Sequence, residues 1–178
     1  MRLLAIDPGK HHAGWALFVD GKLTRAGIEK APEVEPVERA DYRQGRHKAH
    51  VTTRCALVGN LIHGVGFVDE VIAELPHVYV DGNRRLTGKA DPNDLLFLAF
   101  TAGVLTGSAH RADSRLVEPS EWKGQRPDSV TWKWIRDAMK PAEIEIAIAH
   151  DVYDDRHRKT FHHGLEAIGI GLWASWRL

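Results

Sequence analysis

Two short apolar segments of the chain each end in an aspartate that stands next to a turn. Asp7 ends the first segment, before Pro8, and Asp81 ends the second, before Gly82. Aspartate is common at turns because its side chain hydrogen-bonds nearby backbone, so either residue alone indicates no more than a turn. Two strands that both end in aspartate can lie side by side in a mixed sheet, and this predicts a paired-carboxylate site.

A histidine and a glutamate stand three residues apart at the start of the last apolar segment. His163 and Glu166 share one face of a helix expected over 163–176. Gly169 and Gly171 cost this helix roughly 1 kcal/mol each relative to alanine, which makes sense if it packs closely on the sheet. A glutamate in a first turn is also favoured by the helix dipole, so the pair has an ordinary explanation beside the functional one.

Together, Asp7, Asp81 and Glu166 make a set of acids that repel one another unless cations neutralise them. Carboxylate oxygens suit Mg²⁺ or Mn²⁺. Two such ions ~4 Å apart activate a water and stabilise the leaving oxygen of a phosphodiester. His163 is expected to position a water, assist proton transfer or complete a metal shell. The predicted catalytic and metal-binding residues are therefore Asp7, Asp81, His163 and Glu166.

The expected elements begin with three antiparallel strands, over 3–7, 13–19 and 22–29, with a tight turn at Asp20-Gly21. Helical sequence is expected over 42–74 with a break near 64–66, and then over 93–105, 129–139, 141–150 and 163–176. Further strands are expected over 77–81 and 115–118. This order predicts an α/β fold with a mixed five-stranded sheet flanked by helices. The length fits a single domain over residues 1–178.

The 24 lysines and arginines balance 24 aspartates and glutamates, so only local basic clusters indicate nucleic-acid binding. The single cysteine excludes an internal disulfide framework and a cysteine-based zinc site. With no long apolar run, a cytoplasmic protein is expected. For any one basic cluster alone, solvated loops and helix faces are the favoured explanation. The candidate DNA-binding residues are Lys10, Arg43, Arg46, Lys48, Arg54, Arg84, Arg85, Lys89 and Lys123.

Several segments resemble those of RuvC-type Holliday junction resolvases, in the RNase H-like superfamily. The opening Leu4-Ala5-Ile6-Asp7-Pro8-Gly9 resembles the strand that carries their first catalytic aspartate, and the segment 163–173 resembles their final helix. Val78-Tyr79-Val80-Asp81 resembles the strand that ends in their second acid. Pro119, Trp122, Lys123 and Gly124 resemble a Pro-x-x-Trp-Lys-Gly segment of phage-type members.

The resemblance implies a homodimeric, Mg²⁺-dependent endonuclease that nicks two strands of a four-way junction symmetrically, leaving 5′-phosphate and 3′-hydroxyl ends. It would act in the cytoplasm of a bacterial cell or a phage-infected host. A broader endonuclease of flaps and forks, or a junction-binding module with weakened chemistry, stays open. The family usually has glutamate at the position of Asp81 and aspartate at that of Glu166. One side chain is thus shorter by a methylene group and the other longer. We hypothesise that the two changes compensate, so that the carboxylates together still reach the metal ions.

Other residues near these motifs have competing interpretations. Lys123 is expected to support the active site or to bind DNA, whereas Trp122 is expected in the core. Glu118 also ends a strand and ranks below Asp81 as a metal ligand. Glu143 and Glu145 are expected to be solvated on a charged helix.

Overall fold

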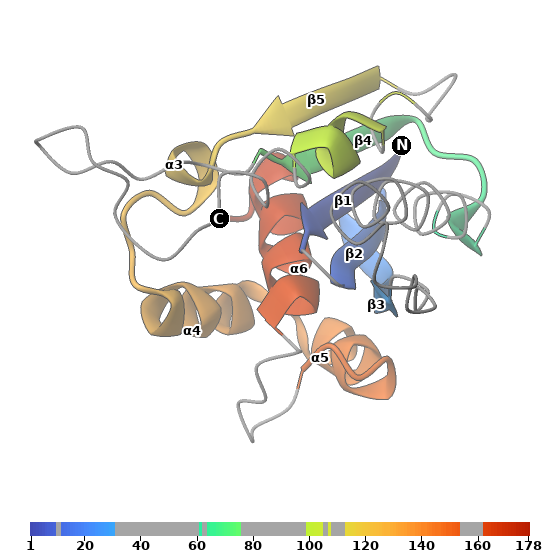
Figure 1. Ribbon diagram of the computed structural model, residues 1–178. Coiled ribbons are helices and arrows are strands. Elements are labelled where there is room, and N and C mark those ends of the chain that lie inside the picture. Colours follow the sequence, from blue (N-terminus) through green and yellow to red (C-terminus); the bar gives the residue numbers. More distant parts are fainter. Residues whose placement is uncertain are drawn as a thin grey trace, which may run out of the picture.

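A computed structural model describes residues 1–9, 12–30, 61, 64–75, 99–104, 107, 113–153 and 162–178. Its centre is a five-stranded sheet in the order β3-β2-β1-β4-β5 (Figure 1). The first three strands are antiparallel, while β4 and β5 run parallel to β1. The mixed sheet predicted from the sequence is confirmed. The strands are β1 Arg2–Pro8, β2 His12–Val19, β3 Lys22–Lys30, β4 Glu70–Glu74 and β5 Asp113–Val117.

Four helices of the second half of the chain are α3 Pro119–Trp122, α4 Asp128–Ala138, α5 Pro141–Ala149 and α6 His162–Ala174. In Figure 1, α6 runs along one face of the sheet, and α4 and α5 lie beside it. Helical residues are also found at 61, 64–65, 99–104 and 107. None of the helices in these ranges is long and apolar enough to cross a membrane.

The alternation of side chains along the central strands separates two cores. Leu3 and Ala5 of β1 pack in the same cluster as Ile168 of α6. Leu4 and Ile6, which point the other way, pack with Leu61, Val65 and Ala102 on the opposite face. Because side chains alternate with a period of two, Asp7 falls on the same face as Leu3 and Ala5. The first acid of the sequence therefore faces α6.

Glycines set the short distance between α6 and the sheet. A Cβ added at Gly171 would lie 2.0 Å from the ring of Phe18, and one at Gly14 of β2 would lie 1.9 Å from the carbonyl oxygen of His163. On another side of α6, a Cβ added at Gly169 would lie 2.6 Å from Ile135 of α4 and 2.7 Å from Trp122 of α3. Any side chain larger than hydrogen at these positions would push the helix outward. The close packing that the helix glycines predicted is what the structure has.

The main departure from the expected elements concerns the fourth strand. The helix expected through residue 74 ends before residue 70, because Glu70–Glu74 forms β4 between β1 and β5. Val71, Ile72 and Ala73 are buried on both sides of the sheet, and such a short apolar run fits a buried strand as well as a helix. The strand expected over 77–81 lies outside the described residues, as does the beginning of the helix expected over 93–105.

A buried ion pair fastens the C-terminal residues to α5 and to the β2–β3 turn. Arg177 donates from Nη1 and Nη2 to the two carboxylate oxygens of Glu143, at 2.7 Å each, and Nη1 also donates to the carbonyl of Gly21. Glu143 accepts further hydrogen bonds from the backbone N–H groups of Leu23 and Lys140. The expectation that Glu143 is solvated is wrong, because its side chain is buried and accepts hydrogen bonds from Arg177. The sequence does not indicate this pairing, because the two residues are 34 positions apart. Glu145 is exposed, as expected.

This ion pair predicts a loss of stability in acid. Burial raises the pKa of Glu143, but the hydrogen bonds from Arg177, Lys140 and Leu23 outweigh it and hold the pKa at about 2. A lowered carboxylate pKa contributes stability above its ordinary value of 4.5, which is lost as the pH falls toward 2. We expect the free energy of unfolding to fall by on the order of 3 kcal/mol over this range.

The measurement is urea unfolding of the wild type and Glu143→Gln between pH 5 and pH 2, with the exposed Glu145→Gln as the matched control. We expect Glu143→Gln to be less stable than the wild type at pH 5. Its free energy of unfolding should also fall less steeply between pH 5 and pH 2. If the free energy of unfolding depended on pH equally in the wild type and Glu143→Gln, the role assigned to the Glu143–Arg177 ion pair would be contradicted.

Candidate metal centre

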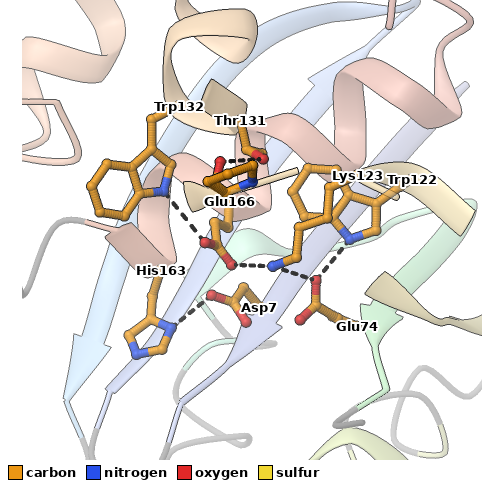
Figure 2. Close-up of polar contacts among 9 residues, drawn as sticks. Asp7, Glu74, Trp122, Lys123, Thr131, Trp132, His163 and Glu166 are labelled. Atoms are coloured by element: carbon orange, nitrogen blue, oxygen red, sulfur yellow. Dashed lines mark hydrogen bonds and ion pairs between the residues drawn. The ribbon is translucent and has the colours of Figure 1, made fainter. Parts of the chain in front are cut away.

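Three carboxylates from distant parts of the chain meet at one edge of the sheet. The parallel register pairs Ile6 of β1 with Ala73 of β4, so Asp7 and Glu74 follow as neighbours where the two strands end. Glu166 reaches the same place from the second turn of α6. Each residue offers a carboxylate oxygen, and these oxygens all lie within 4.8 Å of one another (Figure 2). Asp7 and Glu166 are buried, and Glu74 is half-buried.

His163 holds the carboxylate of Asp7 from the first turn of α6. Its Nδ1 lies 2.6 Å from Asp7 Oδ2. An ionised carboxylate only accepts hydrogen bonds, so Nδ1 is the donor. A Cβ on Gly9 would lie 2.5 Å from His163 Nε2, so the glycine after Asp7-Pro8 makes room for the ring. The Asp-Pro-Gly turn thus both supplies a carboxylate and admits the histidine that orients it.

Lys123 lies between the other two carboxylates, directly after the short helix α3. Its Nζ donates to Glu166 Oε2 at 2.9 Å and lies 3.4 Å from Glu74 Oε2. The lysine side chain is only 12% exposed, so little water screens these contacts. Lys123 therefore lies in the carboxylate cluster, and its expected roles in the active site and in DNA binding stay predictions.

Two indole groups supply the remaining hydrogen bonds to the glutamates. Trp122 Nε1 donates to Glu74 Oε2 at 2.7 Å, and Trp132 Nε1 of α4 donates to Glu166 Oε1 at 3.3 Å. Figure 2 shows both rings pointing their N–H edges into the site. Trp122 is buried, as expected of a core residue, but its polar edge also fixes the position of an acid.

The electrostatics of the cluster reflect an excess of buried negative charge. Burial, with the charges of Asp7 and Glu166, raises the pKa of Glu74 to about 8, although Lys123 and Trp122 oppose the shift. Burial and the charge of Asp7 likewise raise the pKa of Glu166. Each glutamate is thus harder to ionise here than an exposed glutamate, and added positive charge would oppose this effect.

The two basic side chains respond in the opposite way. Burial lowers the pKa of His163, but its hydrogen bond to Asp7 and the charges of the nearby acids outweigh this and raise the pKa above its usual value. Burial also lowers the pKa of Lys123, yet the charges of Glu74 and Glu166 raise it further, so the net shift is upward. The ammonium is fully protonated at neutral pH.

The donor set fits a hard divalent cation. Three carboxylates within 4.8 Å of one another offer oxygen ligands of the kind that Mg²⁺ and Mn²⁺ prefer. Burial and the charges of neighbouring carboxylates raise the pKa values of Glu74 and Glu166, although Lys123 opposes both shifts. A cation between these oxygens would relieve that repulsion.

The structure brings together three of the four predicted site residues, Asp7, His163 and Glu166, and adds Glu74, which the sequence analysis missed. Asp81 lies outside the described residues, so its role stays a prediction. The signal for Glu74 was β-branched Val71-Ile72 shortly before Pro76, the same pattern of a strand ended by a turn residue. The hypothesis that Asp81 and Glu166 compensate in length also stays a prediction.

The remaining candidates lie apart from the cluster or outside the described residues. Glu118 is exposed and accepts a hydrogen bond from Ser120 at 3.1 Å, so it is not one of the clustered acids. Of the candidate DNA-binding residues, only Lys123 is described. Those outside the described residues are Lys10, Arg43, Arg46, Lys48, Arg54, Arg84, Arg85 and Lys89.

Two solved structures resemble this arrangement over nearly its whole length. Thermus thermophilus RuvC aligns with a TM-score of 0.55 and 17% sequence identity, covering 97% of this chain and 92% of that chain. The chain has a RuvC-like fold. T. thermophilus RuvC in complex with a Holliday junction substrate aligns with a TM-score of 0.51 and 16% identity, covering 97% of this chain and 90% of that one. No protein-family model and no curated protein sequence matches significantly.

The raised pKa of Glu74 predicts how stability depends on pH and metal. Without divalent ions, the unfolded chain releases this proton near 4.5 while the folded chain keeps it to about 8, so stability falls as the pH rises between these values. Mn²⁺ bound to the ionised cluster would raise the melting temperature most at the upper end of this range. Thermal melts from pH 5 to pH 8, with and without Mn²⁺, measure both effects.

The matched variants for this measurement are Glu74→Gln and the exposed Glu145→Gln. Glu74→Gln should flatten the metal-free pH dependence and reduce the shift with Mn²⁺, whereas Glu145→Gln should behave as the wild type. A shift with Mn²⁺ that survives in Glu74→Gln would place the ion elsewhere.

Proposed function

We propose that this protein is a metal-dependent endonuclease that resolves four-way DNA junctions. The observation that carries the proposal is the meeting of Asp7, Glu74 and Glu166 at the ends of β1 and β4 on a RuvC-like fold. One of the two similar structures is RuvC in complex with a Holliday junction substrate, which supports branched DNA as the substrate class. The resemblance of the Asp-Pro-Gly and His163–Glu166 segments to RuvC-type resolvases points the same way.

The cofactor of this proposal is Mg²⁺ or Mn²⁺, held by Asp7, Glu74 and Glu166. When bound, the metal supplies Lewis-acid activation of the phosphodiester and of the attacking water. His163 keeps the carboxylate of Asp7 in one orientation, and Trp132 does the same for Glu166. Because the groups that orient the acids come from α4 and α6, the site is set before substrate arrives. Hydrolysis would leave 5′-phosphate and 3′-hydroxyl ends.

Paired nicks require two such sites, so the proposal includes a homodimer. A two-fold symmetric protein matches the two-fold symmetry of a four-way junction and places one site on each of two equivalent strands. The basic residues of 43–54 and 84–89 would contact phosphates along the arms, which positions DNA without reading its sequence.

The test is cleavage of a labelled four-way junction and of linear duplex with the same arms, with Mg²⁺ or Mn²⁺. We expect symmetric nicks in the junction alone. Replacement of Asp7 by Asn, or of Glu74 or Glu166 by Gln, should reduce the rate at least about 100-fold, because even groups that only support metal ligands cost 10–100-fold. Glu145→Gln is the matched control and should cut as the wild type does.

Other outcomes would redirect the assignment. Equal cutting of junction and duplex would indicate a broader endonuclease of branched or linear DNA. Tight junction binding without cutting under either metal would indicate a binding module with lost chemistry. Full activity in Glu74→Gln would show that the second acid is another residue, with Asp81 as the first to test.

A further inference from the structure

The cation already built into the carboxylate cluster is the ammonium of Lys123. It contacts Glu166 at 2.9 Å and Glu74 at 3.4 Å, and all three side chains are at most 12% exposed. A surface lysine that paired with these acids would be flexible and hydrated. Lys123 instead follows α3 directly, with the indole of Trp122 at 5.0 Å from its Nζ.

We propose that Lys123 competes with a divalent ion for Glu74 and Glu166, so that full metal loading of the cluster requires its ammonium to leave. The proposal rests on the metal-dependent function proposed above. It adds to the expectation of two ions per site. In the metal-free protein, the ammonium of Lys123 occupies the position that the second ion would take.

The distribution of hydrogen bonds divides the cluster into a free side and an occupied side. Both oxygens of Glu166 already accept a hydrogen bond, one from Trp132 and one from Lys123. Glu74 Oε2 accepts from Trp122 and contacts Lys123. Among the described residues, Asp7 Oδ1 and Glu74 Oε1 have no such partner. A first ion is therefore expected between Asp7 and Glu74, on the side away from Lys123.

An ion on the other side would have to share Glu166 Oε2 and Glu74 Oε2 with the ammonium. Like charges at such short range repel, and this repulsion is strong where water is scarce. Lys123 and the second ion therefore exclude each other. An ammonium released from the cluster stays tethered beside it, where it can meet a phosphate oxygen of the substrate as a point charge.

The test is a Mn²⁺ titration of the full chain by calorimetry, with bound Mn²⁺ counted by electron paramagnetic resonance. The variants are Lys123→Met and Lys123→Gln, and the matched control is Lys133→Met, which removes an exposed lysine of α4. We expect Mn²⁺ to bind either Lys123 variant at least about fivefold more tightly than the wild type, or in greater number. Fivefold is the low end of ordinary coupling between two ligands. Lys133→Met should bind as the wild type does.

Each result has a distinct meaning. Unchanged or weaker Mn²⁺ binding in both Lys123 variants, with normal binding by the wild type, overturns the competition and leaves the proposed function intact. Absence of Mn²⁺ binding in every chain overturns the metal-dependent function itself. A variant that folds only when Mn²⁺ is added, followed by circular dichroism, supports the competition, because the ion then replaces the missing ammonium.

Discussion

The repulsion among three buried carboxylates is the constraint to which the surrounding structure responds. Asp7, Glu74 and Glu166 lie within reach of one ion, in a place with little water. The groups that hydrogen-bond them among the described residues are all donors: a lysine ammonium, two indoles and an imidazole. The protein thus holds negative charge together with partial neutralisation, and leaves an attraction for added cations.

The position of α6 is what makes this cluster possible. Asp7 and Glu74 are neighbours because β1 and β4 are parallel, but Glu166 belongs to a helix that must come close to the strand ends. Hydrogen in place of a side chain at Gly14 and Gly171 allows that approach. The same helix carries His163 on its first turn, so one packing contact places both Glu166 and the histidine that hydrogen-bonds Asp7.

The sequence predicted most of the sheet because its signals there are local. Alternating apolar residues and the Asp20-Gly21 turn define the first three strands, and Asp7 and Glu166 stand in recognisable motifs. Glu74 was missed because Val71–Ala73 is too short for its periodicity to separate strand from helix. Its parallel pairing with β1 decides the matter, and such pairing between distant segments leaves no local mark.

Polar roles of individual side chains were harder to predict for a related reason. Trp132 looks like a packing residue at helical spacing, and nothing near it in sequence indicates that its N–H faces Glu166. Glu143 of α5 looks like a solvated helix residue, because its partner Arg177 lies 34 positions later, beyond the C-terminal end of α6. The sequence shows which hydrogen-bond donors and acceptors are present, whereas the fold determines which of them come into contact.

The hydrogen bonds from two indoles to the glutamates have a consequence for the fluorescence of the protein. Trp122 and Trp132 are in direct contact with the carboxylates that would bind an ion, and the other tryptophans of the described residues contact neither glutamate through a hydrogen bond. Emission from an indole depends on the charge and hydrogen bonding at its ring. The intrinsic fluorescence of this protein is therefore expected to change if an ion binds to the carboxylate cluster, without any attached dye.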